Sequence, residues 1–499
     1  METNDLGRKK LAGSGIVQFT FAFSVLLVCA ISLRVVLYHT LPVFVTADSW
    51  DYVLAARGLG DRIDFYSAGL RDWRTPGYPI LLALVSCCSQ SLQSNHIVAI
   101  QVAFGVTAML LGGLAGVLAG SRVTAIGMAL FLAVNPVYLL FEHAVMTETL
   151  SIMCVSGYMV AVLWASKRSD LPMRGGLAVG ALFSLCILTR SNLLLFCAIS
   201  ITVVPLSWYA CQQRLATGGA RHAWKYLAAV ALTAGVLVGP WLMRNGSAYG
   251  DFTLLKSINR NLLVYKSMYD PVDLSLPKIR AITDVLGSQD LNYDWLARLT
   301  SVYGPVQGEV IARDLWWEQI SAHPERYAVD VLQSLLGFAG FYYNQAGDLT
   351  ALHHWFTEYL VDVSLQDANN LSLDGYQGFR YVPTLHHNRQ ILEVWSESGM
   401  AYLRVFRPAM NIALLLAFTL YLWRFLRSKP LAIKQRDVIL LVFATAYMSS
   451  AFLHILTLAV NDRFVSSYDL IAVFLLLLTL DTLAGQSLGE TVQLRIADC

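Results

Sequence analysis

Charged residues are scarce in this chain. Only 14% of its 499 residues are Asp, Glu, Lys or Arg, whereas 56% are hydrophobic, and the mean hydropathy is +0.53. Soluble domains carry about 25% charged residues, so this composition excludes an ordinary soluble enzyme and indicates a polytopic membrane protein. The formal net charge of +2 gives no basis for a nucleic-acid partner.

Patterns typical of other protein classes are also missing. The eight cysteines contain no C-x-x-C pair and nearly all lie in or beside apolar segments, so we expect neither disulfides nor a zinc site. The sequence has no obvious repeat or low-complexity tract. Its short N-terminus ends in Arg8, Lys9 and Lys10, and no A-x-A cleavage pattern follows the first apolar segment. We interpret that segment as a retained helix whose basic end is cytoplasmic.

Long apolar segments, in contrast, recur along the whole chain. A helix needs about 20 apolar residues to cross a bilayer. The segments that we interpret as crossings are 16–38, 97–119, 123–140, 149–165, 175–189, 192–209, 226–243, 402–426, 438–460 and 467–483. Two shorter apolar runs, 79–92 and 331–343, are expected to lie at the membrane face. The prediction is therefore an all-α bundle of about ten or more transmembrane helices.

The positive-inside rule orients these segments. Arg122 and the basic clusters at 8–10, 167–174, 214–225 and 429–436 should be cytoplasmic, which places both termini inside. The predicted divisions are an N-terminal transmembrane catalytic module at 1–243 with its first outer loop at 39–95, a partly helical extracytoplasmic cap at 244–401, C-terminal transmembrane helices at 402–484, and a cytoplasmic tail at 485–499.

The first outer loop is unusually rich in charged and aromatic residues. Between Thr46 and Pro79 it reads TADSWDYVLAARGLGDRIDFYSAGLRDWRTPGYP. Asp48 has two interpretations: a general base that takes a proton from an acceptor hydroxyl, or a helix cap, which T-A-D-S favours. In the RTPGYP turn, Arg74 is a candidate phosphate ligand, as is Arg71, and each could equally bind a lipid headgroup or a nearby aspartate. Tyr78 belongs to the same turn.

Further polar residues gather at the same predicted outer interface, where charges are costly and usually paired or functional. Glu142 and Glu148 in FEHAVMTETL are candidate acids that could orient the acceptor or complete a metal site, although an acidic residue at a helix start also explains Glu148. The remaining candidates are His143, Arg190, Arg244, Arg260 and Arg463. Arg244 and Arg463 could meet a lipid phosphate or act as interfacial anchors.

The order of these motifs resembles the GT-C glycosyltransferases. The nearest branch is similar to the protein O-mannosyltransferases and the lipid A aminoarabinose transferases. The shared features are the loop aspartate in TADSWDY, the RTPGYP turn, Thr147-Glu148, Thr189-Arg190, PWLMRN at 240–245, and Arg463-Phe464. The N-terminal half matches well and the C-terminal half loosely. The chain departs from the family at Ser49, where many members carry a second acid, and it lacks a proline after Phe464.

This resemblance implies a GT-C-type fold and a specific reaction. A sugar would pass from a polyprenyl-phosphate or dolichyl-phosphate donor to a hydroxyl on a protein, lipid or polysaccharide acceptor, with inversion, at the extracytoplasmic face. It implies that Asp48 is the base, that Glu148 or its competitor Glu142 is the second acid, and that Arg244 and Arg463 lie near the donor phosphate. No cofactor is required; a divalent metal serves only some relatives, and no metal ligand is assigned. The expected location is a bacterial inner membrane, with the active site facing the periplasm and membrane lipids around it.

Two other classes compete with this prediction. A transporter or flippase for a lipid-linked or anionic solute would also carry charges in a membrane bundle, but such proteins tend to show inverted repeats and polar midplane helices. A noncatalytic membrane scaffold would leave the acidic first loop unexplained.

Overall fold

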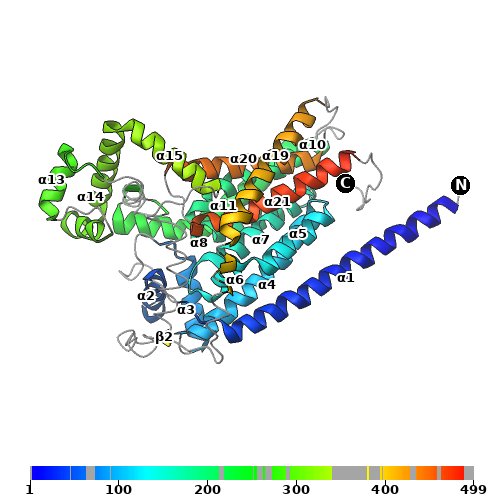
Figure 1. The fold of residues 1–499 in the computed structure, drawn as a ribbon, viewed down its shortest axis with the longest axis horizontal. Coiled ribbons are helices and arrows are strands. Elements are labelled where there is room, and N and C mark those ends of the chain that lie inside the picture. Colours follow the sequence, from blue (N-terminus) through cyan, green and yellow to red (C-terminus); the bar gives the residue numbers. More distant parts are fainter. Residues whose placement is uncertain are drawn as a thin grey trace.

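A computed structural model of the chain describes most of the predicted membrane segments and part of the cap (Figure 1). The described residues are 3–44, 47–62, 74–89, 92–212, 219–250, 252–254, 262–263, 272–287, 293–339, 379–380, 394–395, 397–399, 401–427, 434–457 and 462–487. Arg71 and Arg260 lie outside these residues.

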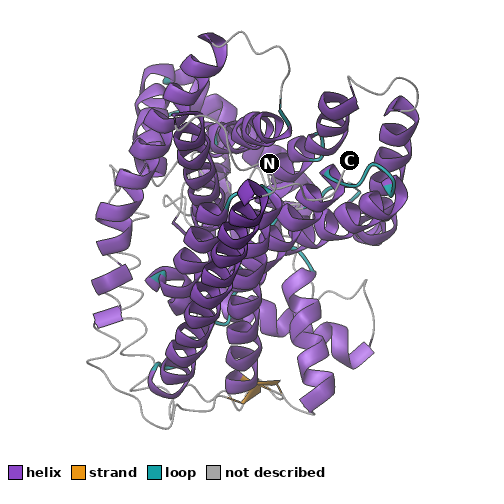
Figure 2. Ribbon diagram, turned by 90° about the vertical axis from the view of Figure 1, so that its right-hand side faces the viewer, coloured by secondary structure: helices purple, strands orange, loops and turns teal. Residues whose placement is uncertain are grey.

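The described structure is overwhelmingly helical (Figure 2). The first half of the chain forms α1 (Thr3–Thr40), α2 (Ala47–Arg62), α3 (Gly77–Ser89), α4 (Ser94–Leu118), α5 (Arg122–Val134), α6 (Pro136–His143), α7 (Glu148–Ser166), α8 (Pro172–Thr189), η1 (Ser191–Leu193), α9 (Leu194–Ser200), α10 (Val203–Gln212) and α11 (Gly219–Tyr249). The second half forms α13 (Pro277–Leu286), α14 (Tyr293–Ala322), α15 (Pro324–Ala339), a π-helical turn η4 (Tyr402–Phe406), α19 (Arg407–Arg427), α20 (Gln435–Leu456) and α21 (Asp462–Ser487).

The prediction of many long apolar helices is confirmed. Within the described residues, nine helical segments are long and apolar enough to cross a bilayer, or ten if the bent pair α5–α6 forms one crossing. The chain is an integral membrane protein, and the expected number of crossings agrees with this count. The short apolar run predicted at 79–92 is the 13-residue helix α3, which is too short for a crossing.

One predicted crossing, 123–140, is broken. α5 and α6 meet at an angle of 51° at Asn135. The Asn135 side chain accepts hydrogen bonds from the Val137 and Tyr138 amides, and Pro136 occupies the first turn of α6. An N-cap asparagine followed by proline starts a new helix, which explains why the apolar run does not continue straight.

Glycines allow the closest helix contacts. A Cβ at Gly176 would lie 2.5 Å from the Tyr226 carbonyl oxygen, and one at Gly180 would lie 2.9 Å from that of Val230. These two glycines are four residues apart on α8, so they form a smooth stripe against α11. Small residues at this spacing let membrane helices approach closely, and the backbone contacts here follow that rule.

The bundle has two distinct ends, which agree with the grouping predicted from charge. The start of α1 and the end of α21 lie at the right in Figure 1, whereas α2, α3, α13 and α14 lie at the left. At the right-hand end the Gln435 amide donates to the carbonyl and hydroxyl oxygens of Ser166, each at 3.1 Å. Lys167 and Arg168 therefore lie at the same end of the bundle as Lys434 and Arg436.

The cap is partly helical, as expected, and has a small core of its own. Ile279, Trp295 and Leu315 are buried in it, among others. α14 breaks at Gly304, whose φ of 77° lies in the left-handed region that glycine tolerates. Within this all-α fold, Leu92–Gln93 (β1) and Phe379–Arg380 (β2) form a two-residue parallel pair, which ties part of the cap region to the first outer loop.

Candidate functional site

Within the described part of the chain, the predicted site residues lie towards the end of the bundle that carries α2 and α3, and backbone pairing anchors the start of the first outer loop there. The Phe44 amide donates to the His143 carbonyl oxygen at 2.8 Å, and the Val145 amide donates to the Phe44 carbonyl oxygen at 2.9 Å. The start of the loop is therefore fastened to the FEHAVMTET motif. His143 itself is buried, so its ring is part of this junction rather than of an open surface.

Asp48 lies in the first turn of α2, which begins at Ala47. Its backbone is described, while its side chain lies outside the described structure. Asp51 and Tyr52, three and four residues further on, share the same helix face. These three positions therefore lie along one face of α2.

That face of α2 meets the RTPGYP turn. The Arg74 guanidinium lies 3.6 Å from the Asp51 carboxylate and 5.1 Å from the centre of the Tyr52 ring. The Tyr52 and Tyr78 rings pack edge to face at 5.1 Å. Of the two interpretations given for Arg74, the structure shows its pairing with a nearby aspartate. The same contacts place Arg74 within one helical turn of Asp48.

The turn is locked onto the end of α8. The Thr75 hydroxyl donates to the Thr189 carbonyl oxygen at 2.8 Å. A Cβ at Gly77 would lie 2.7 Å from the Leu188 carbonyl oxygen, so only glycine fits at this approach. The RTPGYP turn thus has a fixed position beside Arg190, which follows Thr189 directly.

Arg190 and Glu148 form a buried ion pair. The Arg190 Nη2 atom lies 2.7 Å from Glu148 Oε1, and the Arg190 Nε atom donates to the Thr147 hydroxyl at 3.3 Å. The side chains of Arg190 and Glu148 are 6% and 0% exposed. Glu148 opens α7, so the expected helix-start role is confirmed and the ion pair is added to it.

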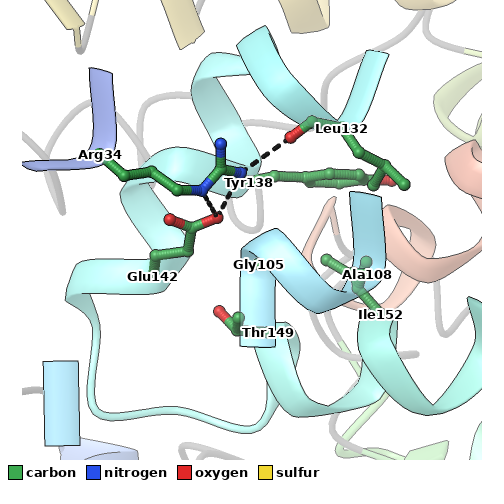
Figure 3. Close-up of a pocket in the computed structure, with 8 residues that line it drawn as sticks. All are labelled: Arg34, Gly105, Ala108, Leu132, Tyr138, Glu142, Thr149 and Ile152. Carbon is green, nitrogen blue, oxygen red and sulfur yellow. Dashed lines mark hydrogen bonds and ion pairs between the residues drawn. The ribbon is translucent and has the colours of Figure 1, made fainter. Parts of the chain in front are cut away.

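The other candidate acid, Glu142, has a different partner. The Arg34 Nη2 and Nε atoms donate to Glu142 Oε1 at 2.7 and 3.1 Å, and Nη2 also donates to the Leu132 carbonyl oxygen at 2.9 Å (Figure 3). The Ala133 carbonyl oxygen accepts a further bond at 3.3 Å. Arg34 therefore bridges α1, the bend between α5 and α6, and Glu142.

A small pocket adjoins this ion pair. It is lined by Tyr138, Glu142 and Thr149, with Gly105 and Ala108 on α4 (Figure 3). Its volume of about 10 Å³ is close to the minimum that holds one water molecule. A sugar does not fit here, so the Glu142 environment is a packed junction.

Tyr78 connects the two acidic regions. Its hydroxyl donates to Gln101 Oε1 at 2.7 Å, and the Gln101 amide donates to the carbonyl oxygens of Glu142 and Ala144 at 3.0 and 2.7 Å. The Tyr78 side chain is fully buried. This chain of hydrogen bonds fixes the RTPGYP turn relative to the segment between Glu142 and Glu148.

Arg244 lies near α2 through its neighbour Trp241. Its guanidinium lies 5.0 Å from the centre of the Trp241 ring and donates to Asn245 Oδ1 at 2.8 Å. Trp241 packs against Ala55 of α2. The Arg244 side chain is buried, with 1% of its surface exposed.

The start of α21 completes the assembly. Arg463 lies in its first turn, with its side chain outside the described structure. One turn later, the Ser467 hydroxyl lies 3.0 Å from that of Ser151, and the Tyr468 hydroxyl donates to the Asn192 carbonyl oxygen at 2.7 Å. These contacts bring the Arg463 position to the same end as Glu148 and Arg190.

The sequence-based reasoning missed several buried polar residues. His454 is buried, and its ring is 5.2 Å from that of Tyr468. Arg407 and Asp469 form another buried pair at 3.1 Å, with the Tyr402 hydroxyl donating to Asp469 at 3.2 Å. All of these lie in predicted crossings, where a lone ionisable residue is itself a signal of function or pairing.

Comparison with known proteins identifies no relative: no protein-family model matches the chain, and no curated protein is significantly similar to it.

Proposed function

We propose that the protein is an integral membrane glycosyltransferase. It moves a sugar from a polyprenyl-phosphate donor to a hydroxyl acceptor at the extracytoplasmic face, with inversion and with Asp48 as general base. The observation that carries this proposal is the meeting of three elements at one end of the bundle. They are the Asp48 helix, the fixed turn that holds Arg74, and the buried Glu148–Arg190 pair.

The reaction needs a base and an anion-stabilising group on opposite sides of the sugar carbon. The acceptor oxygen attacks the anomeric carbon and its proton passes to the Asp48 carboxylate. The bond between the anomeric carbon and the phosphate oxygen breaks, and the polyprenyl phosphate leaves with the electron pair. A single displacement of this kind inverts the anomeric configuration.

Arg74 and Arg244 supply the positive charge for the leaving phosphate beside one face of α2. Arg74 contacts α2 through Asp51 and Tyr52, and Trp241, one helical turn before Arg244, packs on Ala55. Guanidinium groups at a membrane interface bind phosphate well and stabilise the charge that develops on it in the transition state. Further candidates for binding this phosphate are Arg463, at the start of α21, and Arg71 and Arg260, which lie outside the described residues.

The two candidate acids have different roles in this proposal. Glu148 is held by Arg190 next to the RTPGYP turn, so it orients the acceptor or the turn that meets it. Glu142 is enclosed by Arg34 and by backbone, in a pocket with space for about one water molecule. We therefore propose that Glu142 stabilises the fold, whereas Glu148 belongs to the active site. The proposed compartment is the bacterial inner membrane, with this end facing the periplasm.

The broken helix α5–α6 favours a second candidate, a transporter. Discontinuous helices in transporters leave backbone carbonyls free to bind a solute at the membrane midplane. Here the carbonyls of Leu132 and Ala133 receive hydrogen bonds from Arg34. Because these carbonyls are already hydrogen-bonded, they are not available to bind a solute. The polar residues gathered at one end of the bundle therefore favour sugar transfer over transport.

The test uses purified, full-length protein in liposomes that contain a panel of polyprenyl-phosphate sugars. Release of polyprenyl phosphate with acceptor glycosylation is measured for the wild type, for Asp48→Asn, and for Asp61→Asn. Asp61 lies in the last turn of the same helix, roughly 20 Å along its axis. We expect turnover to fall by about 10²- to 10⁴-fold in Asp48→Asn only.

Two results would refute the proposal. Full turnover in Asp48→Asn would remove the assignment of the base. Movement of the intact lipid-linked sugar between leaflets, without release of polyprenyl phosphate from any donor in the panel, would favour the transporter instead.

A further inference from the structure

Helix α15 turns polar residues towards the protein and apolar residues outward, which is the reverse of a helix on a water-soluble domain. The residues that it buries against the protein are Asp330, Ser334 and Phe338. Its exposed face is apolar, and the exposed fractions are 53% for Val329, 54% for Leu332, 46% for Leu335 and 37% for Leu336. A helix surrounded by water on its outer side would turn these leucines inward.

α15 runs antiparallel to α20 and reaches well down its length. Near the start of α15 the Tyr327 hydroxyl donates to the carbonyl oxygen of Leu456, the last residue of α20. Near its end the Phe338 ring lies 6.1 Å from the Tyr447 ring. The nine residues from Leu456 to Tyr447 span about 14 Å of helix. This depth is close to half the thickness of a bilayer core of about 30 Å.

The exposed face of α15 adjoins a surface that faces lipid. α20 is one of the segments long and apolar enough to cross the membrane. Met448, Phe452 and Leu453 are exposed on it over the same stretch that α15 follows, with exposed fractions of 57%, 60% and 48%. The apolar surface of the crossing therefore continues onto α15.

The polar residues of α15 have a matching environment on the inner side. Asp330 and Ser334 fall between the two contacts of α15 with α20, as Ser450 and His454 do on α20, and all four side chains are buried. Tyr447, His454 and Tyr468 continue this polar and aromatic layer towards Arg190. Because polar side chains in a membrane face the protein interior, this arrangement is the one expected of a helix within the bilayer.

From these observations we infer that α15 is a half-span. It enters the bilayer from the end of the bundle that carries the candidate site, and its face of Val329, Leu332, Leu335 and Leu336 contacts phospholipid acyl chains. The inference does not depend on the proposed reaction, because it rests on the packing and exposure of α15 alone.

The test places the photoreactive residue p-benzoylphenylalanine at single positions and reconstitutes the purified protein in phosphatidylcholine liposomes. Leu332 and Leu336 are the test positions. Phe452 on α20 is the control that should contact lipid. Val285, on α13 in the cap and 60% exposed, is an apolar control that should contact water.

After illumination, intact-mass spectrometry detects covalent adducts. We expect a mass increase of one phospholipid at 332 and 336, with a yield comparable to that at 452, and none at 285. Three outcomes would overturn the inference. They are no lipid adduct at 332 and 336 while 452 reacts, equal lipid adducts at 285, or a cross-linked dimer at 332 and 336, which would make the face an interface between copies of the chain.

Discussion

Phe44 and His143 are joined by a backbone hydrogen bond of 2.8 Å, across almost the whole first outer loop and three helices of the bundle. The bond sets the start of α2 relative to the segment that leads into α7. As a result, the two acidic positions that the resemblance selects, Asp48 and Glu148, belong to one assembly although they are distant in sequence.

The Glu148–Arg190 pair should be important for stability as well as for activity. In Glu148→Gln the buried Arg190 charge loses its partner, and removing one member of a buried pair costs about 3–5 kcal/mol. Unfolding in detergent can be followed with a thiol-reactive fluorophore, because Cys154, Cys186 and Cys197 are buried. The double variant Glu148→Gln with Arg190→Gln should recover part of the stability but no activity. A single variant as stable as the wild type would contradict this account.

Gly105 should be essential for the Arg34–Glu142 junction. A Cβ at this position would lie 1.9 Å from Glu142 Oε1, so Gly105→Ala must displace the carboxylate. We expect a loss of about 1–3 kcal/mol, as is usual for overpacking. Gly235→Ala on α11 is the control, because nothing lies within 4 Å of the added methyl group. Its helix propensity should rise, which leaves stability unchanged or improves it by up to about 1 kcal/mol. Thermal unfolding of both variants in one detergent decides between these outcomes.

Removing the Tyr78 hydroxyl should loosen the RTPGYP turn. Tyr78→Phe leaves the buried Gln101 Oε1 atom without its donor, which costs about 1–3 kcal/mol. Tyr38→Phe is a matched control, because the Tyr38 hydroxyl reaches only the Asn95 carbonyl oxygen at 3.5 Å. Limited proteolysis after Arg74 should be faster in Tyr78→Phe alone. Equal cleavage of the two variants would show that this hydrogen bond does not hold the turn.

The cap should lose stability in acid. Hydrogen bonds from the Ser275 side chain, then from His323 and the Ser275 amide, lower the pKa of Asp273 to about 2. The ionised carboxylate is therefore the form that the folded cap favours. Its contribution is complete above about pH 4, near the unfolded pKa, and is lost as the pH falls through 2. Hydrogen exchange in α13 and α14, corrected for the intrinsic rate at each pH, should accelerate across this window in the wild type. In Asp273→Asn exchange should already be faster at pH 5 and should change less with acid.

The sequence predicted which end of the bundle each residue occupies better than it predicted which acid pairs with which arginine. Charge counts and apolar lengths placed Asp48, Glu148, Arg190 and Arg244 at one end, because these signals depend on each segment separately. Which acid meets which arginine depends on how helices pack. Glu142 therefore binds Arg34 of the first helix, whereas Glu148 binds Arg190, and neither spacing indicates this.

Two structural features also escaped the sequence patterns for physical reasons. The segment 123–140 is apolar throughout, so hydropathy indicates one straight crossing. The bend arises from the side-chain cap of Asn135, which hydropathy does not register. The α15 segment was predicted at the membrane face because it is short. Its reversed amphipathicity becomes visible only once the partner helix α20 is known.

The position of Arg34 constrains the order in which the protein is built. Its partner Glu142 follows 108 residues later, so at 5–20 residues per second the ribosome needs on the order of 10 s to produce it. During that interval the Arg34 guanidinium lacks this partner. Arg34 lies six residues before the end of α1, so its long side chain can reach the headgroup region. We therefore expect the Arg34–Glu142 pair, and with it the final packing of α1, to form only after α5 and α6 have been made.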